Sequence, residues 1–352
     1  MPVVTAQTLE KMVFHIFNSL GAPDDEAQTL SRIIVDSNLA GHDSHGVNMV
    51  PSYVRATREG LIVPGAPTIT ETETASTARI DGGWNYGHVV AKRAMEMAIE
   101  KAKKTDIACV VARRLHHIGR VGSYPEMAAK AGFIGITACS TGPGGNEQAA
   151  FGGTKRSLGT NPLSIAFPSD LEGPVLLDMA TSVVAAGKVR IARSRGTKIP
   201  PHWVLDSEGK PSTDPMAFFN GGTLLPLGGQ EGHKGYGLAF AVDVLCGILS
   251  RDGASTAGDH RFANPTFTFA LNPEVFVSLA DLKKEVGDLA RFQKTNPPLP
   301  GVKEVQYPGE KEATSRLKYG PHGIDVEDST WQQLVNIVRE QGLESKVGPL
   351  PS

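Results

Sequence analysis

The sequence contains 352 residues, of which 40% are hydrophobic and 20% are charged, so it can bury a substantial core, and we expect two lobes. The 35 Lys and Arg against 37 Asp and Glu give a formal net charge of -2, which argues against nucleic acid as the main partner because no broad basic surface is available to neutralise phosphates. No stretch has the roughly 20 apolar residues that cross a bilayer, and no basic-then-apolar leader opens the chain, so we expect a soluble, cytoplasmic protein without a membrane partner.

The first two predicted elements are helices. Apolar residues recur at helical spacing through the first 20 residues, and Gly21 and Pro23 end the pattern. Asp24 and Asp25 open a second helical pattern, which gives way at Gly41 to a polar, histidine-bearing turn. We therefore expect a helical lobe that begins at the N-terminus.

After a Pro- and Thr-rich connection, short apolar runs alternate with helical patterns. The predicted strands cover residues 78–81, 107–112, 133–140, 163–167, 175–177 and 267–271, and the predicted helices cover residues 86–103, 181–192, 235–249 and 329–341. We assign residues 1–77 plus 297–352 to a discontinuous helical lobe and residues 78–296 to an α/β lobe. The strand order cannot be read from this pattern.

Three cysteines, Cys109, Cys139 and Cys246, are widely separated in apolar or small-residue contexts. Their spacing is typical of neither a zinc site nor a disulfide framework, so we interpret them as buried thiols in a reducing compartment. No metal is expected from them.

The sequence lacks the G-x-G-x-x-G turn that a Rossmann dinucleotide site requires. Gly142, Gly144 and Gly145 come nearest, but Glu147 takes the place of the last glycine and Pro143 interrupts the turn. Turn chemistry alone favours an ordinary glycine-rich loop. If a nicotinamide cofactor binds, another architecture must hold its pyrophosphate.

Two histidine pairs are candidates for proton transfer: His42 with His45, and His116 with His117. Histidine passes protons at neutral pH, and both pairs precede glycine in turns that follow regular elements. A single histidine of this kind is more often a structural hydrogen-bonding group than a functional one. Metal binding is the other alternative, although no His-x-x-x-His pair supports it.

Five motifs follow one another along the chain: 41–46 (GHDSHG), 159–162 (GTNP), 177–182 (LDMATS), 233–237 (HKGYG) and 308–310 (PGE). In this order they resemble the malate/L-lactate dehydrogenase family, a group of non-Rossmann NAD(P)-dependent oxidoreductases. Residues 42–53 and 116–120 most resemble its hydroxycarboxylate dehydrogenase B branch. The resemblance spans most of the chain and implies an α/β malate/L-lactate dehydrogenase-like fold, with a mixed sheet, flanking helices and a helical lobe.

The resemblance implies a 2-hydroxycarboxylate dehydrogenase that uses NAD, with NADP as the alternative, and forms a homodimer. It assigns general acid/base catalysis to His117, with His45 and Ser44 close to the substrate and the nicotinamide. Many family members carry an arginine for the substrate carboxylate where this chain has Met49. Arg120 is then a substitute for that cation, a ligand of the cofactor phosphates or a surface residue, and in the second case Ser44, Thr160 and backbone amides would take the carboxylate. Met49 itself favours bulkier or apolar oxoacid tails.

The same resemblance places the cofactor against several separate segments. The implied contacts are His45, Gly119, Arg120, Val121, Leu176, Leu177, Asp178, Met179, Ala180, Lys234, Asn272, Pro308, Gly309 and Glu310. Amides after Asp178 would receive an anion at a helix N-terminus, and Lys234 would offer a point charge. The turn after Asp178 is equally an ordinary helix cap, and Asn272 before Pro273 is equally a strand-ending turn.

Three other functions stay open at this point. A cyclic imine reductase of the piperideine-carboxylate type belongs to the same family and would differ in the electrophile. A histidine-based metal hydrolase would need stoichiometric metal, whereas the dehydrogenase would survive chelators. A non-catalytic binding protein would bind nicotinamide without turning over any oxoacid.

Overall fold

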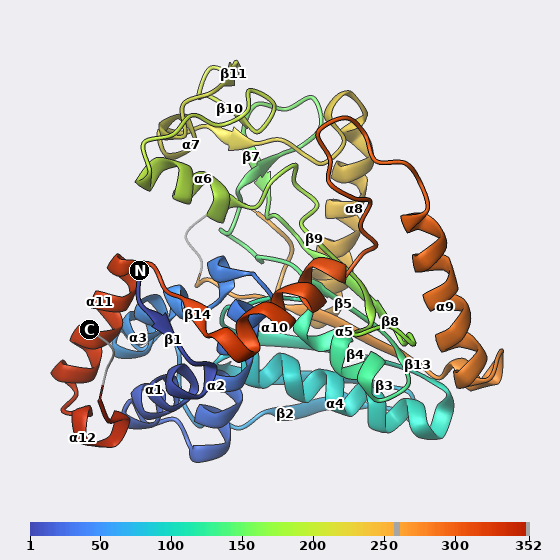
Figure 1. Cartoon of the computed structure of the whole chain (residues 1–352), viewed down its shortest axis with the longest axis horizontal. Helices are drawn as coiled ribbons and strands as arrows, with labels where there is room; N and C mark the ends of the chain where they lie inside the picture. The colour runs from blue at the N-terminus through green and yellow to red at the C-terminus, as the bar shows by residue number, and fades with distance from the viewer. Residues whose placement is uncertain (257–260, 350–352) are drawn as a thin grey trace.

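The computed structural model describes residues 1–256 and 261–349, and a seven-stranded sheet forms its centre (Figure 1). The strands are β2 (Ile69–Glu73), β3 (Thr77–Asn85), β4 (Ile107–Leu115), β5 (Ile134–Cys139), β8 (Leu163–Phe167), β9 (Val175–Met179) and β13 (Thr266–Leu271). Their order is β2-β3-β4-β13-β5-β8-β9. Only the β3–β4 pair is parallel, so the sheet is mixed and is not a doubly wound parallel sheet. Each of the six predicted strands is present in it.

Helices cover both faces of the large sheet. On one face lie α4 (Gly87–Thr105) and α5 (Ser123–Lys130), and the buried alanines and methionine of α4 pack with Cys139 of β5. On the other face, α8 (His233–Asp243) and a π-helical turn, Val244–Ile248, pack against Ala138. Neighbouring residues of β5 therefore face opposite layers, as the alternation of a strand requires.

The two ends of the chain meet in a helical unit. It contains α1 (Ala6–Ser19), α2 (Asp24–Leu39), α3 (Val50–Arg58), α11 (Asp328–Glu340) and α12 (Glu344–Val347), and β1 (Val3–Val4) pairs with β14 (Ile324–Asp325). Leu9, Phe17, Leu30 and Leu334 are fully buried in its core. Each helix has one apolar stripe, and packing these stripes together removes them from water. The three helices predicted in this unit, α1, α2 and α11, are confirmed, and so is the helix predicted over residues 86–103, which is α4.

A third unit holds a smaller sheet. Its order is β11-β10-β12-β6-β7, formed by β6 (Gln148–Ala149), β7 (Arg156–Leu158), β10 (Val204–Leu205), β11 (Pro211–Ser212) and β12 (Thr223–Leu224). Two helices, α6 (Ala186–Ser194) and α7 (Met216–Phe219), pack on it with Val189, Val204 and Leu224 in the core. Figure 1 shows α6 on the side of this unit that faces the helical unit.

Several elements differ from the predictions. Helix α6 begins at Ala186 and not at Thr181, because the N–H of Thr181 donates to the carbonyl of Thr160 and Ser182 bridges to Pro226. Two further helices, α9 (Leu279–Lys294) and α10 (Glu310–His322), were not predicted. Strand β2 lies within the range assigned to the helical lobe and pairs with β3, and the division into two lobes stays a prediction.

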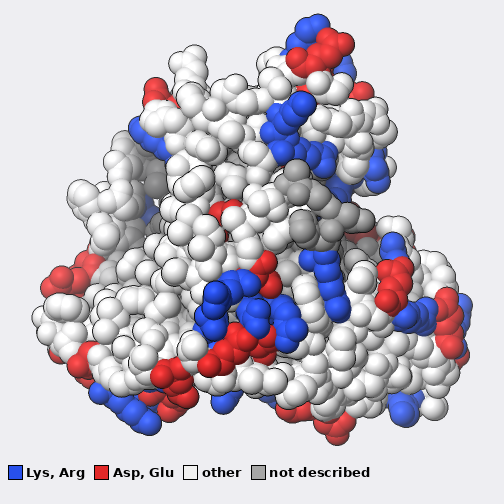
Figure 2. Space-filling model, turned by 180° about the vertical axis from the view of Figure 1, so that it is seen from behind, with Lys and Arg blue, Asp and Glu red and all other residues white. Residues whose placement is uncertain are grey.

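Among the described residues, no helix combines the length and the apolar character that a bilayer crossing requires. On the face shown in Figure 2, Lys and Arg side chains lie among Asp and Glu side chains and do not form one broad basic surface. This distribution agrees with the balanced formal charge of the sequence.

A buried ion-pair network ties the helical unit to the sheet. Arg120 is 2% exposed, and its Nη1 lies 3.3 Å from Oε2 of Glu126 and 3.5 Å from Oδ2 of Asp36. Arg316 of α10 contacts the same two carboxylates at 2.9 and 2.8 Å. The network joins α2, α5 and α10, and its charges compensate one another away from water.

Replacing Glu126 by Gln will lower the free energy of unfolding by about 3 kcal/mol, because the guanidinium of Arg120 then stays buried with less compensating charge. Urea denaturation of the variant measures this change. The matched control is Glu208→Gln, since Glu208 forms an ion pair with Lys210 whose side chains are 70% and 73% exposed. That variant should stay within about 0.5 kcal/mol of the original chain. Equal stability of the Glu126 variant and its control would contradict a stabilising network.

Candidate active site

Two imidazoles from distant turns lie side by side. His45 ends the 3-10 turn Asp43–His45 after α2, and His117 follows β4. Their ring centroids are 5.8 Å apart with an interplanar angle of 13°. The structure therefore brings together the two histidines that the sequence selected from separate turns.

The hydrogen bonds of His117 fix its tautomer. The backbone N–H of Gly119 points to Nδ1 of His117 at 3.3 Å, and the hydroxyl oxygen of Tyr53 lies 2.6 Å from the same atom. An N–H can only donate, so Nδ1 accepts and the proton of the neutral ring is on Nε2. Burial raises the pKa of Tyr53, which keeps the phenol protonated and able to donate to Nδ1.

Tyr53 and His88 are site residues that sequence reasoning missed. Tyr53 was noted only as part of a matching segment, and His88 stands alone in the helical pattern of α4. The ring of His88 lies 5.2 Å from that of Tyr53 and 6.5 Å from that of His117, and neither of its nitrogens has a hydrogen-bond partner among the described residues. The position of Tyr53 eight residues after His45 gives only a weak indication that Tyr53 belongs to the site. It shows no more than that both residues lie near the start of α3.

Burial keeps the imidazole cluster uncharged at neutral pH. It lowers the pKa of His45 and of His116 to about 4 and that of His88 to about 3, and neighbouring cations or imidazoles add to each shift. Burial is also the main reason why the pKa of His117 lies well below its usual value. The site therefore offers neutral hydrogen-bonding groups and not imidazolium charges.

Ser44 and His45 face the first turn of α6. The hydroxyl of Ser44 lies 3.0 Å from Nδ1 of His45, and a Cβ placed on Gly187 would stand 3.5 Å from Cβ of Ser44. Met49 is half-buried and packs against the core of the helical unit. The helix N-terminus that was expected directly after Asp178 thus lies instead beside Ser44.

Three of the predicted cofactor segments meet around β9. The N–H of Gly122 donates to Oδ2 of Asp178 at 3.0 Å, and the N–H of Leu176 donates to the carbonyl of Pro308 at 3.0 Å. Gly309 has φ +93°, and a Cβ there would stand 2.8 Å from the nitrogen of Leu176, so the close approach requires glycine. Lys234 is exposed in the first turn of α8.

Arg120 is not a surface residue, which removes one of the three alternatives for it. Its guanidinium lies within 3.6 Å of Asp178 in addition to Asp36 and Glu126. Its charge is therefore shared among carboxylates of the chain.

The carbonyl of Thr160, another predicted substrate residue, accepts from both the N–H and the hydroxyl of Thr181.

Asn272 lies at the opposite end of the large sheet from the histidines. Its N–H and side chain bond to Asp106, directly before β4, whereas His117 follows β4. The nine residues of β4 span about 30 Å at roughly 3.3 Å per residue. A second Asn-Pro pair begins at Asn264 before β13, and there Oδ1 accepts from the N–H of Ile118 beside His117. Because β13 runs antiparallel to β4, Asn264 occupies the site end and Asn272 does not.

The turn at Gly142, Gly144 and Gly145 leads into β6 and not into a helix, so it lacks the helix N-terminus of a Rossmann phosphate site. Among residues 1–256 and 261–349, no group of three His, Cys, Asp or Glu side chains is arranged to hold a metal ion. In the described residues the imidazoles contact one another and the phenol of Tyr53.

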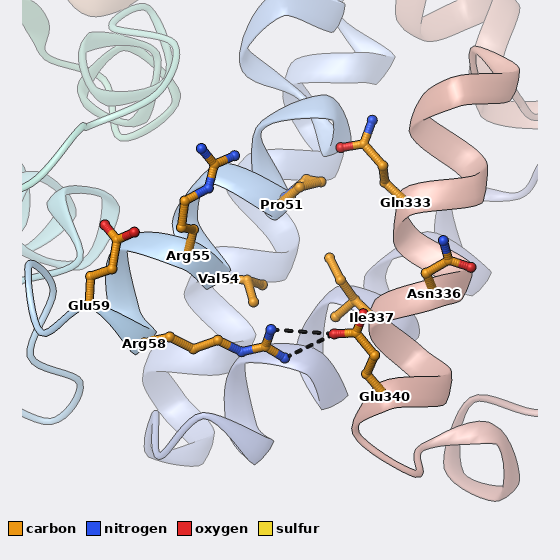
Figure 3. Close-up of a pocket in the computed structure, with 9 residues that line it drawn as sticks. All are labelled: Pro51, Val54, Arg55, Arg58, Glu59, Gln333, Asn336, Ile337 and Glu340. Carbon is orange, nitrogen blue, oxygen red and sulfur yellow. Dashed lines mark hydrogen bonds and ion pairs between the residues drawn. The ribbon is translucent and has the colours of Figure 1, made fainter.

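A surface groove of about 500 Å³ lies elsewhere, between α3 and α11 (Figure 3). Pro51, Val54 and Ile337 line it, and Arg58 pairs with Glu340 across it at 3.3 Å. No imidazole lines this groove. We therefore place the candidate active site at the histidine cluster, where several groups able to transfer protons converge.

Comparison with known proteins identifies relatives over nearly the whole chain. The family model described as malate/L-lactate dehydrogenase matches residues 4–335. The chain is 35% identical to L-sulfolactate dehydrogenase of Methanocaldococcus jannaschii, covering 97% of this chain and 98% of that protein. It is 35% identical to hydroxycarboxylate dehydrogenase B of Escherichia coli, covering 96% and 94%. The structure of malate dehydrogenase from Entamoeba histolytica superposes with a TM-score of 0.92 at 29% identity, covering 100% of this chain and 99% of that one, which confirms the predicted fold class.

The buried histidines make stability depend on pH. Because their pKa values are lower in the folded chain than the unfolded value of about 6.5, the unfolded chain binds more protons below that pH. The free energy of unfolding is therefore highest above pH 6.5 and decreases as the pH falls toward 4, with about 1–2 kcal/mol lost by pH 5 through His45 alone. Urea denaturation at pH 7.5, 6 and 5 measures the slope. His45→Gln should give a shallower slope because glutamine does not titrate, and an unchanged slope would contradict the assignment.

Proposed function

Because this chain belongs to the malate/L-lactate dehydrogenase family, we propose that it interconverts 2-hydroxycarboxylates and 2-oxocarboxylates by hydride transfer with NAD(H), with NADP(H) as the alternative cofactor. The observation that carries the proposal is the stacked pair of His45 and His117, with Tyr53 on Nδ1 of His117. Hydride transfer to a carbonyl carbon requires a proton at the carbonyl oxygen, and this pair supplies a positioned donor.

The residues around β9 fit a dinucleotide. Gly309 and Gly122 allow their segments to pack closely against β9, since a Cβ would meet the nitrogen of Leu176 at 2.8 Å and Oδ2 of Asp178 at 2.6 Å, and this packing brings the three segments together. In this proposal residues 119–121, 176–180 and 308–310 line the cofactor, and Lys234 offers a positive charge from α8. Asn272 is left out because of its distance along the sheet. The reduced nicotinamide, when bound, supplies the hydride.

His117 acts as the general acid in reduction. Its Nε2–H donates a hydrogen bond to the carbonyl oxygen and transfers the proton as negative charge develops there. As the Nε2 proton moves to the carbonyl oxygen, the hydroxyl of Tyr53 passes its proton to Nδ1, so the ring stays neutral and the charge left behind is on the phenolate of Tyr53. The raised pKa of Tyr53 favours uptake of a proton from solvent when the product leaves, and in oxidation each proton moves the other way.

In this proposal His45 and Ser44 orient the substrate beside His117. Thr160, the other residue proposed to contact the substrate, lies between β7 and β8. Arg120 positions the turn at Gly122 through Asp178, since its guanidinium is already shared among carboxylates. We do not assign it to the substrate carboxylate. Small-molecule 2-oxoacids are the substrates, and a cytoplasmic location completes the proposal.

Activity of the chain and of two variants tests the proposal. The loss of NADH or NADPH absorbance will be followed with malate-like, lactate-like and phenylpyruvate-like 2-oxoacids and with a cyclic imine. His117→Ala should lower kcat by about 100-fold or more and Tyr53→Phe by about tenfold, because the first removes the proton donor and the second its support. His202→Ala is the control, since His202 is exposed.

Turnover of a cyclic imine without turnover of any 2-oxoacid would favour the reductase alternative. Full sensitivity to chelators would favour a metal hydrolase. A chain that oxidises neither cofactor with any of these compounds would contradict the proposed function.

A homodimer is part of the proposal, and apolar surface on and around α9 supports it. Only Gly287 and Ala290 of α9 are buried, whereas Leu289 and Phe292 are 61% and 66% exposed. Phe276 before the helix and Leu299 after it are 79% and 75% exposed. Large apolar side chains gathered on one element are typical of a protein interface.

The double substitution Leu289→Glu and Phe292→Glu should convert the dimer to a monomer, because two charges would have to be buried in the interface. Light scattering after size-exclusion chromatography measures the mass against the chain mass of 37.3 kDa. Met216→Glu on α7 is the control, at a residue that is 39% exposed. The same mass for all three chains would place the interface elsewhere or exclude it.

A further inference from the structure

The proposed substrates carry a carboxylate next to the reacting carbon, and that charge needs a partner. The four clustered imidazoles are uncharged at neutral pH, as described above, so they offer hydrogen bonds only. Arg120 is buried among three carboxylates. Arg261 is held by the carbonyls of Gly60 and Leu61 and by the ring of Trp84, 4.1 Å away. These two cations are therefore engaged by other groups, and a cation on another element is a candidate for the carboxylate.

Helix α6 presents such a cation. Its first turn stands against Ser44, since a Cβ on Gly187 would lie 3.5 Å from Cβ of Ser44. Arg190 follows Gly187 by three residues, and side chains three apart lie on the same face of a helix. Arg190 is therefore on the face of α6 that is turned toward Ser44 and His45. Its side chain is 56% exposed, so a small solute can reach it from solvent.

Two further observations agree with this placement. After burial and the neighbouring imidazoles, the charge of Arg190 also contributes to the low pKa of His117. The first turn of α6 has no side-chain cap among the described residues; the N–H of Lys188 donates to the carbonyl of Ala185, and the positive end of the helix dipole favours an anion on this side.

We propose that Arg190, with the first turn of α6, binds the carboxylate of the 2-oxoacid while His117 faces its carbonyl oxygen. The inference rests on the proposed function and adds the residue that recognises the acid. In the free chain the guanidinium of Arg190 is held by Glu147, with Nη2 2.9 Å from Oε1. Arg190 exchanges the carboxylate of Glu147 for that of the substrate, which keeps the cation paired before and after binding.

The experiment compares Arg190→Gln, Arg190→Lys, Glu147→Gln and Arg195→Gln. Arg195 is the matched control, because it is an arginine that directly follows the same helix and forms an exposed pair with Glu327, with side chains 63% and 53% exposed. The readouts are KM and kcat for a 2-oxoacid, the Kd of NADH from its fluorescence, and the calorimetric Kd of oxamate, which resembles a 2-oxoacid but is not reduced. Thermal unfolding of each variant establishes that it is folded.

Arg190→Gln should raise KM and the Kd of oxamate by about 10- to 100-fold, with kcat and the Kd of NADH little changed, because a charge-assisted hydrogen bond to the substrate is lost. Arg190→Lys should have a KM and a Kd of oxamate between those of the unsubstituted chain and those of Arg190→Gln. Glu147→Gln should leave KM equal or lower, since it frees Arg190, and Arg195→Gln should change nothing.

Equal increases of KM in Arg190→Gln and Glu147→Gln would mean that the ion pair is structural, and would overturn the inference. A weaker Kd of NADH with unchanged KM would move Arg190 to the cofactor and also overturn it. If the unsubstituted chain reduces no 2-oxoacid, the proposed function fails, and the inference then stands or falls on oxamate binding, which Arg190→Gln must weaken.

Discussion

The chemistry of this site depends on keeping several imidazoles uncharged inside the protein. Moving a cationic imidazole out of water costs more than the surrounding groups return, so the neutral ring is favoured and the position of its single proton becomes decisive. Tyr53 and the N–H of Gly119 fix that position at His117. A neutral ring with a known N–H can donate to an oxygen that gains negative charge without first attracting a competing anion. The surrounding protein therefore selects hydrogen bonding over net charge at the reacting oxygen.

This arrangement needs elements from all three units. The helical unit supplies His45 and Tyr53, the end of β4 supplies His117, and the unit of the small sheet supplies α6. The buried network around Arg120 holds the first two units together, since Asp36 belongs to α2 and Glu126 to α5. Through Asp178 the network also reaches the turn at Gly122, where the cofactor is proposed to bind.

Much of the fold could be predicted from sequence because strong periodicity accompanies burial. The first helix is an example, since its buried residues Leu9, Met12, Val13, Ile16 and Phe17 follow one face. Helix α10 was missed because none of its residues is buried, so no apolar stripe marks it. The start of α6 was misplaced because contacts of Thr181 with Thr160 hold that segment out of a helix, which local pattern cannot reveal.

In the candidate site, too, some residues could be predicted from the sequence and others could not. His45 and His117 were found because histidines in turns before glycine are unusual and the motifs recur in order. Tyr53, His88 and Arg190 were not assigned roles, since each gains significance only from neighbours far along the chain. Asn272 was implied by the resemblance, and its distance from the histidines follows from the direction of β13, which is a property of the whole sheet.

The pairing of α1 to α3 with α11 has a consequence for biosynthesis. During synthesis the N-terminal helices leave the ribosome about 300 residues before α11, which at about 5–20 residues per second is a delay of roughly 15–60 s. Throughout that interval their apolar faces lack the partner that covers them in the finished protein. Until α11 emerges, these helices can cover their apolar faces only by packing against one another, so the helical unit reaches its final packing at the end of synthesis.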